Sequence, residues 1–368
     1  MLLFFARTAT ALAQPVPMVD TPYSGPFAPA RHLTLMIPNP NPESSLKGLL
    51  TRAAVARLDS PGWLRVTGAD RVRWLNGMVT NSIQALAPGQ GCYNFFLNAQ
   101  GRIQADATAF LLEDSILLET DRHRVGALVV LLDHFIIMDD VELAPIGQPG
   151  DPTGERHGIL IAGPNSASVL AHLGLPVETL GSLERRLATW QDSPIELIHA
   201  HSPLVPRYEL WLNSETGAAS LTAALLATGA CKASSADVEQ LRILEGTPLY
   251  GTDIRDKELP QETDQTRALH FAKGCYLGQE IVERIRSRGN VHRTFSGFKL
   301  TGELPPAGAA LTSEEKPVGE LTSVARINLP SGPIQLALGY IRREALDRAT
   351  PIQYPGGTAT PMQLPFPI

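Results

Sequence analysis

Residues 273–284 read Lys-Gly-Cys-Tyr-Leu-Gly-Gln-Glu-Ile-Val-Glu-Arg, the densest group of chemically distinctive residues in the chain. Gly274 and Gly278, on either side of Cys275, permit tight backbone geometry around the thiol. The apolar residues that follow are spaced to share one helix face, and they are Ile281, Val282 and Ile285. The stretch therefore predicts a glycine-rich turn that leads into a helix, with Cys275 close to the helix N-terminus.

Cys275 is a candidate functional thiol. A thiol beside Lys273 and near a helix N-terminus is expected to be shifted toward the thiolate, which is the reactive form. The alternative is a buried structural cysteine, because free cysteines are commonly buried. In the predicted helix Glu280 and Arg284 are four residues apart, a spacing that favours an ion pair. The residues alone leave both interpretations of the thiol open.

Positive charge gathers around this stretch. Between residues 267 and 293 six basic residues are opposed by Glu280 and Glu283, which gives a local charge of +4 in a chain that carries −6 overall. The six are Arg267, Lys273, Arg284, Arg286, Arg288 and Arg293. A run of arginines is usually a solvated helix face. Its position beside two glycines and a thiol nevertheless favours an anion-binding site.

The composition indicates the kind of protein that contains this stretch. The chain has 368 residues, of which 43% are apolar and 18% are charged, so it has the composition of a folded protein with two or three domains. The net charge of −6 argues against a protein whose whole surface binds nucleic acid. No run of about 18 apolar residues is present, which argues against a membrane-spanning helix.

The cysteines do not form a metal or disulfide framework. Cys92, Cys231 and Cys275 are isolated from one another, with no pair at zinc-ligand spacing. We therefore predict no metal site and a reducing compartment. The chain also lacks the loop motifs of dinucleotide-binding proteins, P-loop proteins and serine hydrolases.

Four segments follow one another along the chain. Residues 1–45 contain eight prolines and predict an unstructured leader. Short strands and helices then alternate irregularly, which indicates an α+β architecture, with a Pro- and Gly-rich seam at 145–158. We expect α+β domains at 46–150 and 151–294, the second including the cysteine stretch, and an all-β barrel at 295–368.

Local signals predict three helices with defined ends. Asp70 is placed to cap a helix that opens at residues 67–70. The clearest apolar periodicity predicts one helix over residues 121–138. Ser235 is placed to cap a further helix that stops at Gly246.

The stretch at 273–284 resembles the signature K-G-C-[aromatic]-x-G-Q-E-x-x-x-R of the YgfZ-type folate-binding proteins, which are relatives of the glycine-cleavage T-protein. Residues 66–81, 97–102 and 241–253 resemble the same superfamily. The resemblance implies a T-protein-like α+β fold of three domains around a central cavity that binds tetrahydrofolate or a derivative, with a C-terminal β-barrel. It also implies a role in assembling or repairing iron–sulfur clusters, which indirectly supports tRNA modification by enzymes that carry such clusters.

The resemblance also implies roles for particular residues. Cys275 would be the functional thiol of a motif formed by Lys273, Gly274, Tyr276, Gly278, Gln279, Glu280 and Arg284. The flat pterin ring of a folate stacks on aromatic rings, for which the candidates are Tyr93, Phe95, Phe96 and Tyr250. Folate carboxylates pair with guanidinium groups, for which the candidates are Arg284, Arg286 and Arg288. Asp106 and Arg242 complete the expected folate-binding set.

Two positions differ from the T-protein pattern. Two adjacent acids that follow the second strand pair in those enzymes correspond here to Ala105 and Asp106, so only the second acid is present. The pattern R-I-E-A-G corresponds to Arg-Ile-Leu-Glu-Gly at 242–246, which moves the acid by one position, about 100° around a helix. Both differences argue against an aminomethyltransferase.

We therefore predict a tetrahydrofolate-binding accessory protein of iron–sulfur cluster assembly, with assembly factors or client proteins as partners and no membrane contact. The expected compartment is the cytoplasm, or the mitochondrial matrix in a eukaryote. One alternative is a folate-dependent aminomethyl or other one-carbon transferase that uses Asp106. The other is an RNA-binding module that uses the basic patch at 284–293 and would include contact with tRNA.

Overall fold

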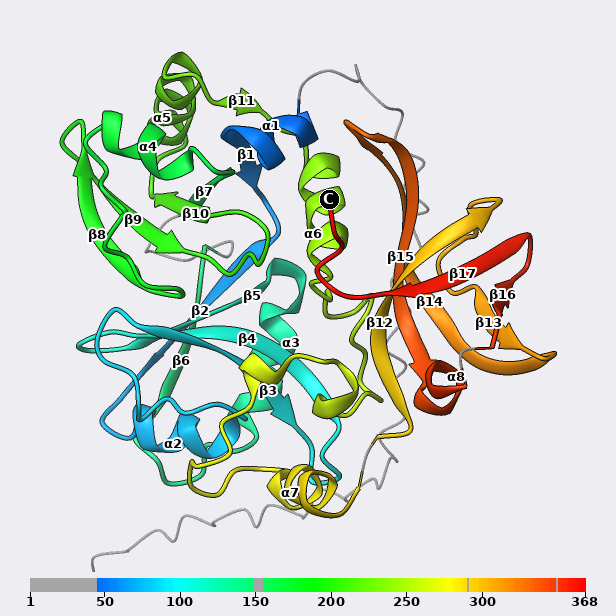
Figure 1. Ribbon diagram of the computed structural model, residues 1–368. Helices are drawn as coiled ribbons and strands as arrows, with labels where there is room; N and C mark the ends of the chain where they lie inside the picture. The colour runs from blue at the N-terminus through cyan, green and yellow to red at the C-terminus, as the bar shows by residue number, and fades with distance from the viewer. Residues whose placement is uncertain (1–44, 148–154, 290, 349) are drawn as a thin grey trace, which may run out of the picture. The chain divides into compact units, whose positions relative to one another are not determined.

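The computed structural model describes residues 45–147, 155–289, 291–348 and 350–368. These residues form two β-sheets and a closed barrel (Figure 1). The leader predicted at 1–45 lies outside the described residues except for Ser45, where α1 (Ser45–Thr51) begins. Within the described ranges no helix is long and apolar enough to cross a membrane.

The first body is a five-stranded antiparallel sheet in the order β3-β4-β5-β2-β6. Its strands are β2 (Pro61–Thr67), β3 (Gly91–Leu97), β4 (Ile103–Leu111), β5 (Ile116–Asp121) and β6 (Glu142–Ile146). The helices α2 (Arg71–Met78) and α3 (Val125–Asp133) pack on one face of this sheet. Ala107 and Ala109 of β4 belong to the core on that face, and the alternation of a strand places Asp106 and Thr108 on the opposite face.

The first predicted helix is confirmed as α2, although Asp70 does not cap it. Asp70 occupies the N-cap position without a capping hydrogen bond. Its carboxylate instead accepts the Asp140 N–H at 3.0 Å and pairs with Arg73 at 3.0 Å. The side chain therefore ties the helix to the loop before β6.

The prediction of one helix over residues 121–138 is wrong, because three different elements share that apolar run. β5 continues to Asp121, whose carboxylate accepts the His123 N–H at 2.8 Å and caps the 3-10 turn η1 (Arg122–Arg124). The helix α3 then ends at Asp133. Beyond it Ile137 and Met138 are 84% and 94% exposed, so nothing in the described structure packs on them to extend a helix.

The second body is a six-stranded sheet in the order β11-β1-β7-β10-β9-β8. Its strands are β1 (Ala54–Leu58), β7 (His157–Ala162), β8 (Arg185–Trp190), β9 (Ser193–His199), β10 (Arg207–Leu212) and β11 (Cys231–Lys232). The helices α4 (Ser166–His172) and α5 (Glu215–Ala227) contribute to one core with it. β1 comes from the range 46–150 and pairs antiparallel with β7 from the range 151–294, so the two ranges share this sheet.

The helix predicted to stop at Gly246 forms as α6 (Ser235–Glu245), and Gly246 ends it with a φ of +68°. The capping residue is Ser234 rather than the predicted Ser235. Ser234 has an extended backbone, its N–H donates to the Asp237 carboxylate at 2.8 Å, and its hydroxyl accepts the Asp237 N–H at 3.3 Å. The cap falls one residue earlier because Asp237 supplies the reciprocal bond.

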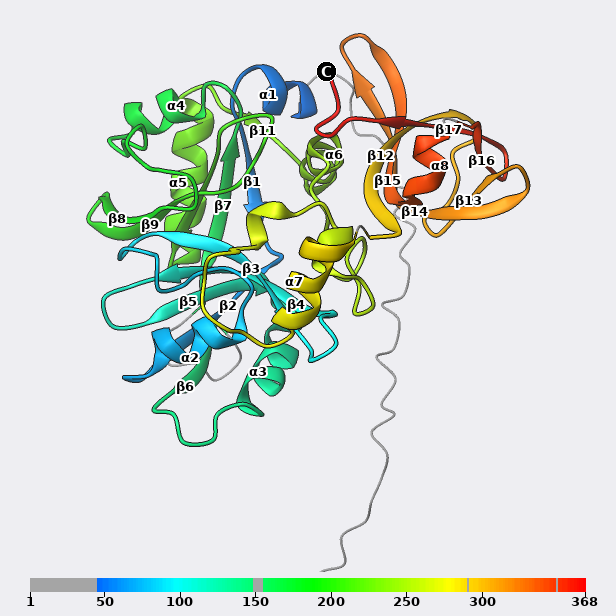
Figure 2. The ribbon, with the colours of Figure 1, turned by 60° about the horizontal axis from the view of Figure 1, so that its bottom comes forward.

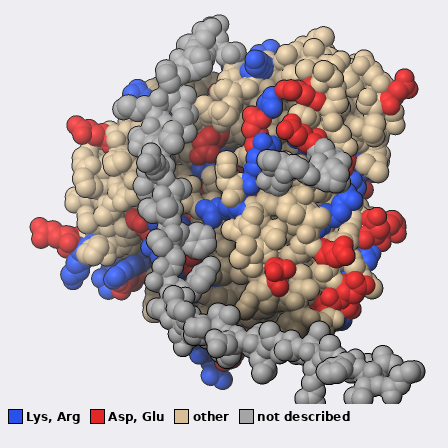
Figure 3. Space-filling view, turned by 180° about the vertical axis from the view of Figure 1, so that it is seen from behind, with Lys and Arg blue, Asp and Glu red and all other residues tan. Residues whose placement is uncertain are grey.

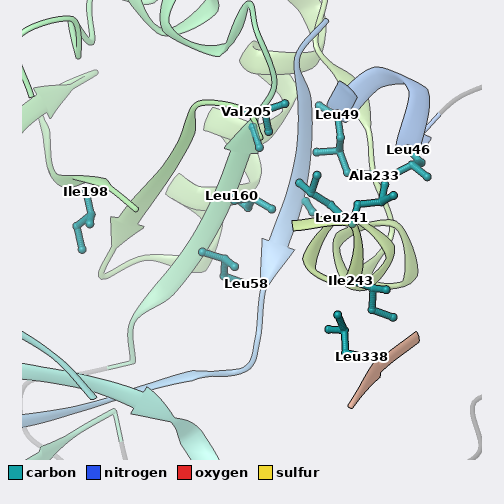
Figure 4. Packing of buried hydrophobic residues seen from close by; sticks show 14 of the residues in the cluster. Leu46, Leu49, Leu58, Leu160, Ile198, Val205, Ala233, Leu241, Ile243 and Leu338 are labelled. Carbon is teal, nitrogen blue, oxygen red and sulfur yellow. The ribbon is translucent and has the colours of Figure 1, made fainter. Parts of the chain in front are cut away.

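The helix α6 lies between the six-stranded sheet and the barrel (Figures 1 and 2). Leu241 and Ile243 belong to a core cluster that also contains Leu58 and Leu160 of the sheet and Leu338 of β15 (Gly332–Arg342) (Figure 4). Burial of this apolar surface at about 25 cal/mol per Å² is what joins the two bodies.

After α6 the chain returns to the five-stranded sheet through η2 (Pro260–Glu262), η3 (Thr266–Ala268) and α7 (Gln279–Arg288). The Ile103 N–H donates to the Glu258 carbonyl at 3.1 Å, and the Thr80 hydroxyl donates to the Ala268 carbonyl at 2.6 Å. Figure 2 shows α7 beside β4. The cysteine stretch therefore packs on strands from the range 46–150.

The third body is a closed barrel in the order β12-β15-β14-β13-β16-β17, as the C-terminal sequence predicts. The remaining elements are β12 (Arg293–Gly302), β13 (Ala310–Ser313), β14 (Lys316–Leu329), α8 (Arg343–Asp347), β16 (Ile352–Tyr354) and β17 (Gly357–Met362). Phe298, Leu311 and Leu321 are fully buried in its core.

Candidate functional site: a cavity between the two sheets

A cavity of about 540 Å³ lies between the two sheets. Its walls come from β3, β4, β5, β9 and β10, from the start of α6, and from residues 57–61 and 247–250 with Arg267. In the described structure no barrel residue lines it. Polar and charged side chains project into an otherwise apolar space, which is the usual make-up of a ligand site.

Tyr93 and Asp106 form the first polar pair of the wall. Tyr93 on β3 donates from its hydroxyl to Oδ2 of Asp106 on β4 at 2.7 Å. Burial raises the pKa of Asp106 to about 6, although the Tyr93 hydrogen bond and the charges of Arg124 and Arg267 oppose that shift. Asp106 can therefore gain or lose a proton near neutral pH.

Two arginines hold the tyrosines of this wall. The guanidinium group of Arg267 lies 4.1 Å from the centre of the Tyr93 ring, and that of Arg124 lies 4.5 Å from the centre of the Tyr250 ring. Tyr250 donates to the Gln104 carbonyl and interacts with the Asp256 carboxylate at 2.6 Å. Burial lowers the pKa of Arg267, whose charge is offset only in part by Tyr93 and Asp106.

The opposite wall carries two glutamates. Glu209 on β10 is 4% exposed and accepts hydrogen bonds from Arg207 Nη2 and Trp211 Nε1, both at 3.2 Å. Glu119 on β5 of the other sheet also lines the cavity. Burial, followed by the charge and hydrogen bond of Glu209, raises the pKa of Glu119 well above its usual value.

His201 also lines the cavity. Desolvation, with the charges of Arg267 and Arg207, lowers the pKa of His201 to about 4, so its ring is neutral at physiological pH. His199 is not in the cavity wall, since its ring stacks on Tyr208 at 4.9 Å and its Nδ1 lies 3.0 Å from the Leu180 carbonyl. In the described ranges no group of His, Cys, Asp and Glu residues could hold a metal ion.

The structure brings together only part of the folate-binding set expected from the sequence. Tyr93, Asp106 and Tyr250 line the cavity. Phe95 and Phe96 are ordinary core residues, 0% and 2% exposed, and do not line it. Successive side chains of a strand point to opposite faces of the sheet. The two rings are therefore buried on opposite sides of β3, each in a different core cluster.

Arg242 lies outside the cavity wall. Its guanidinium group donates to the Asp253 and Glu239 carboxylates at 2.8 Å and 2.6 Å and to the Ser323 hydroxyl at 2.8 Å. Asp253 is fully buried. Arg242 therefore joins α6 to the following loop and to β14, and its donors are used by the protein itself.

Three arginines expected to bind folate carboxylates lie on α7, exposed and outside the cavity wall: Arg284, Arg286 and Arg288. Arg286 lies 4.3 Å from the centre of the Phe271 ring and 3.5 Å from the Glu283 carboxylate. On the face seen in Figure 3 basic and acidic side chains are interspersed. Of the six basic residues counted in the sequence, the three on α7 are thus exposed and lie apart from the cavity, whereas Arg267 lines it.

Lys273 fixes the cysteine motif to the five-stranded sheet. Its ammonium group donates to the carbonyls of Asn76, Val79 and Asn81 at 2.5–2.7 Å. The positive charge of Lys273 therefore holds the turn after α2. The sequence had predicted a different role for this charge, the activation of Cys275. Within the motif the Tyr276 N–H donates to Gln279 Oε1 at 3.2 Å.

Two glycines let the motif and the turn at 98–101 approach each other. Gly278 has a φ of +81°, and a Cβ there would stand 2.5 Å from the Asn98 carbonyl oxygen. A Cβ on Gly101 would stand 2.8 Å from Ile281 Cβ. The two segments, both noted in the sequence, therefore form one packed unit.

The three cysteines have different environments. Cys275 is exposed, Cys231 is half-buried and Cys92 is buried. Burial raises the pKa of the Cys92 thiol to about 11. Of these thiols, Cys275 is the one presented to solvent, and Glu280 of the same motif is also exposed.

Several cavity residues were not identified as site residues from the sequence: Glu119, His201, Arg207, Glu209 and Arg267. Arg267 was counted only as part of the basic patch. A charged residue within an apolar strand, such as Glu209 between Tyr208 and Leu210, is the signal that could have found the others.

The two sheets, the central cavity and the barrel define the aminomethyltransferase type of fold. The crystal structure of glycine cleavage system aminomethyltransferase T from Bartonella henselae superposes with a TM-score of 0.74, covering 88% of each chain at 22% identity. Residues 46–273 match the family model described as GCVT N-terminal domain. The chain belongs to this family.

Its relatives carry different functional names. A putative chloroplastic transferase from Arabidopsis thaliana is 27% identical over 307 residues, 83% of this chain and 69% of that one. The mitochondrial iron–sulfur cluster assembly factor IBA57 from Mus musculus is 27% identical over 313 residues, 77% of this chain and 75% of that one. An aminomethyltransferase from Frankia alni is 27% identical over 273 residues, 71% of each chain.

Proposed function

We propose that this protein is a YgfZ-type accessory protein of iron–sulfur cluster assembly that binds a reduced folate in the cavity and uses Cys275 as its functional thiol. The observation that carries the proposal is the separation of two sites on one sheet. A cavity whose lining complements a folate lies on one side. The exposed thiol lies outside that cavity, on a segment that Lys273 and Gly278 hold against the sheet. Similarity to IBA57 supports the cluster-assembly part.

The cavity lining fits a reduced folate. The Glu209 carboxylate, held in place by Arg207, offers acceptor oxygens that complement the N3–H group of a pterin edge. Tyr93 and Tyr250 supply aromatic surface, and a volume of about 540 Å³ is in the range of sites for drug-sized ligands. A bound reduced folate would supply a ring system that carries one-carbon units.

The cavity residues would hold that ligand and exclude water. The charge of Arg267 is buried and is offset only in part by its neighbours. Arg207 is already paired with Glu209, so Arg267 is the cavity cation best suited to bind a ligand oxygen. Asp106 would hold a proton or release it beside the ligand. No α7 arginine takes part.

Anaerobic calorimetric titration of the full chain with tetrahydrofolate tests the cavity. We expect saturable binding near one per chain. Absence of binding would contradict the folate part of the proposal and leave the thiol part to be judged separately.

Cells that carry only a Cys275→Ala variant test the thiol. Iron–sulfur enzyme activities should fall to the level of cells without the protein, while folding and folate affinity stay near wild type. Cys231→Ala is the matched control, because it removes a half-buried thiol elsewhere. Normal enzyme activities with Cys275→Ala would overturn the role of this thiol.

A one-carbon transferase is the second candidate, and the Tyr93–Asp106 pair is the observation that favours it. A carboxyl group with a pKa of about 6 beside the proposed folate suits proton transfer near neutral pH. Turnover with an aminomethyl or methyl donor should occur and should be lost in Asp106→Asn. Equal rates in both proteins would exclude that role for Asp106.

RNA binding by α7 has weaker support, because Arg286 already interacts with Glu283 and Phe271. Electrostatic RNA binding would fall steeply with salt, so salt-independent affinity would contradict it. A cytoplasmic location remains a prediction, and the relatives named here include chloroplastic and mitochondrial proteins.

A further inference from the structure

The segment that brings Arg267 into the cavity wall is bound by the turn that follows α2. The Thr80 hydroxyl donates to the Ala268 carbonyl at 2.6 Å and accepts the Phe95 N–H at 2.9 Å. The His270 N–H donates to the Thr80 carbonyl at 3.1 Å. Thr80 is fully buried and therefore links this segment to β3, yet none of these three bonds reaches Arg267 itself.

The side chain of Asn81 makes the link to Arg267. Its Nδ2 donates to the Arg267 carbonyl at 2.9 Å and to the Tyr93 carbonyl at 3.1 Å. Its Oδ1 accepts the Ser82 N–H at 2.9 Å, and the Asn81 N–H donates to Asn94 Oδ1 at 3.2 Å. The amide group cannot turn over without losing the bonds of both its oxygen and its nitrogen. Asn81 thus presents two oriented donors, one to each of two segments.

The two carbonyls belong to segments that are constrained to different degrees. Tyr93 lies on β3, where it is paired in register with Thr108 of β4. Arg267 lies on the single 3-10 turn η3, and such short turns have few hydrogen bonds of their own. The Asn81 side chain therefore holds the less constrained segment against a strand that the sheet already fixes.

The place of the Arg267 guanidinium group depends on where that backbone is held. The group lies 4.1 Å from the centre of the Tyr93 ring, and its Nε donates to Gln265 Oε1 at 3.1 Å. In the described structure no carboxylate forms an ion pair with it. Arg267 also lines a second cavity of about 170 Å³ at the end of α6, so the two cavities share this residue. Its remaining donors are therefore available to a ligand.

We propose that Asn81 is a positioning residue, which ties the Arg267 carbonyl to the β3 backbone and thereby holds the Arg267 guanidinium group over Tyr93, in place to bind a ligand oxygen. The effect on ligand affinity rests on the proposed folate function, whereas the placement of Arg267 does not. Asn81 ends the stretch 66–81 noted in the sequence. An apolar side chain at this position would remove the donor from the Arg267 carbonyl.

Removal of the amide should weaken folate binding through Arg267 alone. In Asn81→Ala the turn η3 loses this tie to β3, and the guanidinium group should leave the Tyr93 ring. We expect the dissociation constant for 5-formyltetrahydrofolate to rise about fivefold or more, the effect of one lost hydrogen bond at a buried group. In an Arg267→Gln background the same substitution should change it by less than about twofold, because residues that act through one another are not additive.

Calorimetric titration of four proteins makes this double-mutant cycle: wild type, Asn81→Ala, Arg267→Gln and the double variant. Asn98→Ala is the matched control, because the Asn98 side chain accepts the N–H groups of Gln100 and Arg102 instead of holding the Arg267 segment. It should bind the folate within about twofold of wild type. Equal losses from Asn81→Ala in both backgrounds, or no loss in the wild-type background, would overturn the positioning role.

A local effect must be separated from release of the whole segment. Asn81→Ala keeps the backbone carbonyl that Lys273 binds at 2.6 Å, so labelling of Cys275 by iodoacetamide should stay within about twofold of the wild-type rate. A parallel increase in labelling would overturn a role specific to Arg267. If Asn81→Ala does not fold, Asn81→Asp takes its place, since it keeps the size and the acceptor for the Ser82 N–H but has no donor.

A measurement without folate tests the position of Arg267. In ligand-free protein with ¹⁵N-labelled arginine, the Nε–H signal that disappears in Arg267→Gln identifies this side chain. It should move toward the chemical shift of exposed arginines in Asn81→Ala, because the contacts with Tyr93 and Gln265 are lost, and stay in place in Asn98→Ala. An unmoved signal in Asn81→Ala would overturn the placement. Absence of folate binding to wild type would instead contradict the proposed function, while this signal still decides whether Asn81 positions Arg267.

Discussion

The hydroxyl group of Tyr93 and the carboxyl group of Asp106 are joined by a hydrogen bond of 2.7 Å in the wall of the cavity. The bond fixes the orientation of the acid, yet no basic group in the described structure forms an ion pair with it. Arg267 and Arg124 act on Asp106 only at longer range. Burial therefore dominates and sets the pKa of this acid near neutral pH.

Asp106→Asn should stabilise the folded protein above pH 6. The folded-state pKa of about 6 exceeds the ordinary value of 3.8, so the native protein retains a proton that the unfolded chain has released between those pH values. Wild-type stability from this group is therefore present below pH 4 and lost as pH rises to 6. We expect the stability advantage of the variant to grow over that range to about 2–3 kcal/mol. Urea unfolding at pH 4.5 and pH 7 measures it, and an advantage independent of pH would contradict the assignment.

Arg267→Gln and Arg284→Gln should separate the cavity from the exposed helix. Arg267 stacks on Tyr93 in the cavity wall, whereas Arg284 is exposed on α7. Folate affinity should fall at least tenfold in Arg267→Gln, which is about 1.4 kcal/mol or more, and stay within about twofold in Arg284→Gln. Calorimetric titration compares the two. The reverse order would place the anion site on α7.

Gly278→Ala should destabilise the protein, while Gly274→Ala in the same motif should be tolerated. Gly278 combines a φ of +81° with a Cβ position 2.5 Å from the Asn98 carbonyl oxygen, whereas a Cβ on Gly274 meets nothing within 4 Å. We expect a loss of about 2 kcal/mol or more in unfolding free energy for Gly278→Ala. Equal stability of the two variants in denaturant titrations would show that the motif does not pack on the 98–101 turn.

Native-state thiol labelling should follow burial. Iodoacetamide should modify Cys275 first, Cys231 more slowly and Cys92 only on unfolding, because Cys92 is buried and its pKa is raised to about 11. Mass spectrometry of peptides after timed labelling gives the order. Early modification of Cys92 would mean that the core beneath β3 opens readily.

The sequence predicted elements best where the signal is local. The helix stop at Gly246 and the strands of the barrel are confirmed. The signals that predicted them, a glycine that adopts the left-handed conformation and short strands separated by turns, depend on only a few neighbouring residues. The helix expected over 121–138 failed because apolar spacing does not reveal where a sheet ends. At the start of that range the Asp121 carboxylate caps a separate 3-10 turn, so the helix does not begin there.

The candidate site was predictable only in part. Three of the residues chosen from the sequence line the cavity: Tyr93, Asp106 and Tyr250. The arginines of α7 were chosen as well, but they do not line it. Arg267 reaches Tyr93 because the Asn81 side chain donates to the Arg267 carbonyl at 2.9 Å, a contact across 186 residues. Sequence spacing carries no information about such a contact.

By itself, the sequence determined which residues could carry chemistry: a cysteine between two glycines, a lysine before it, an acid and aromatic residues on adjacent strands. Residue type and short-range spacing are enough for that. Only the tertiary structure decided which of them act together. It placed the Lys273 ammonium group on three backbone carbonyls, left the α7 arginines in solvent, and brought Glu119 and Glu209, from different sheets, into the wall of one cavity. The physical reason is that burial and charge pairing depend on distance in space, and strand pairing between β1 and β7 brings together residues about 100 positions apart.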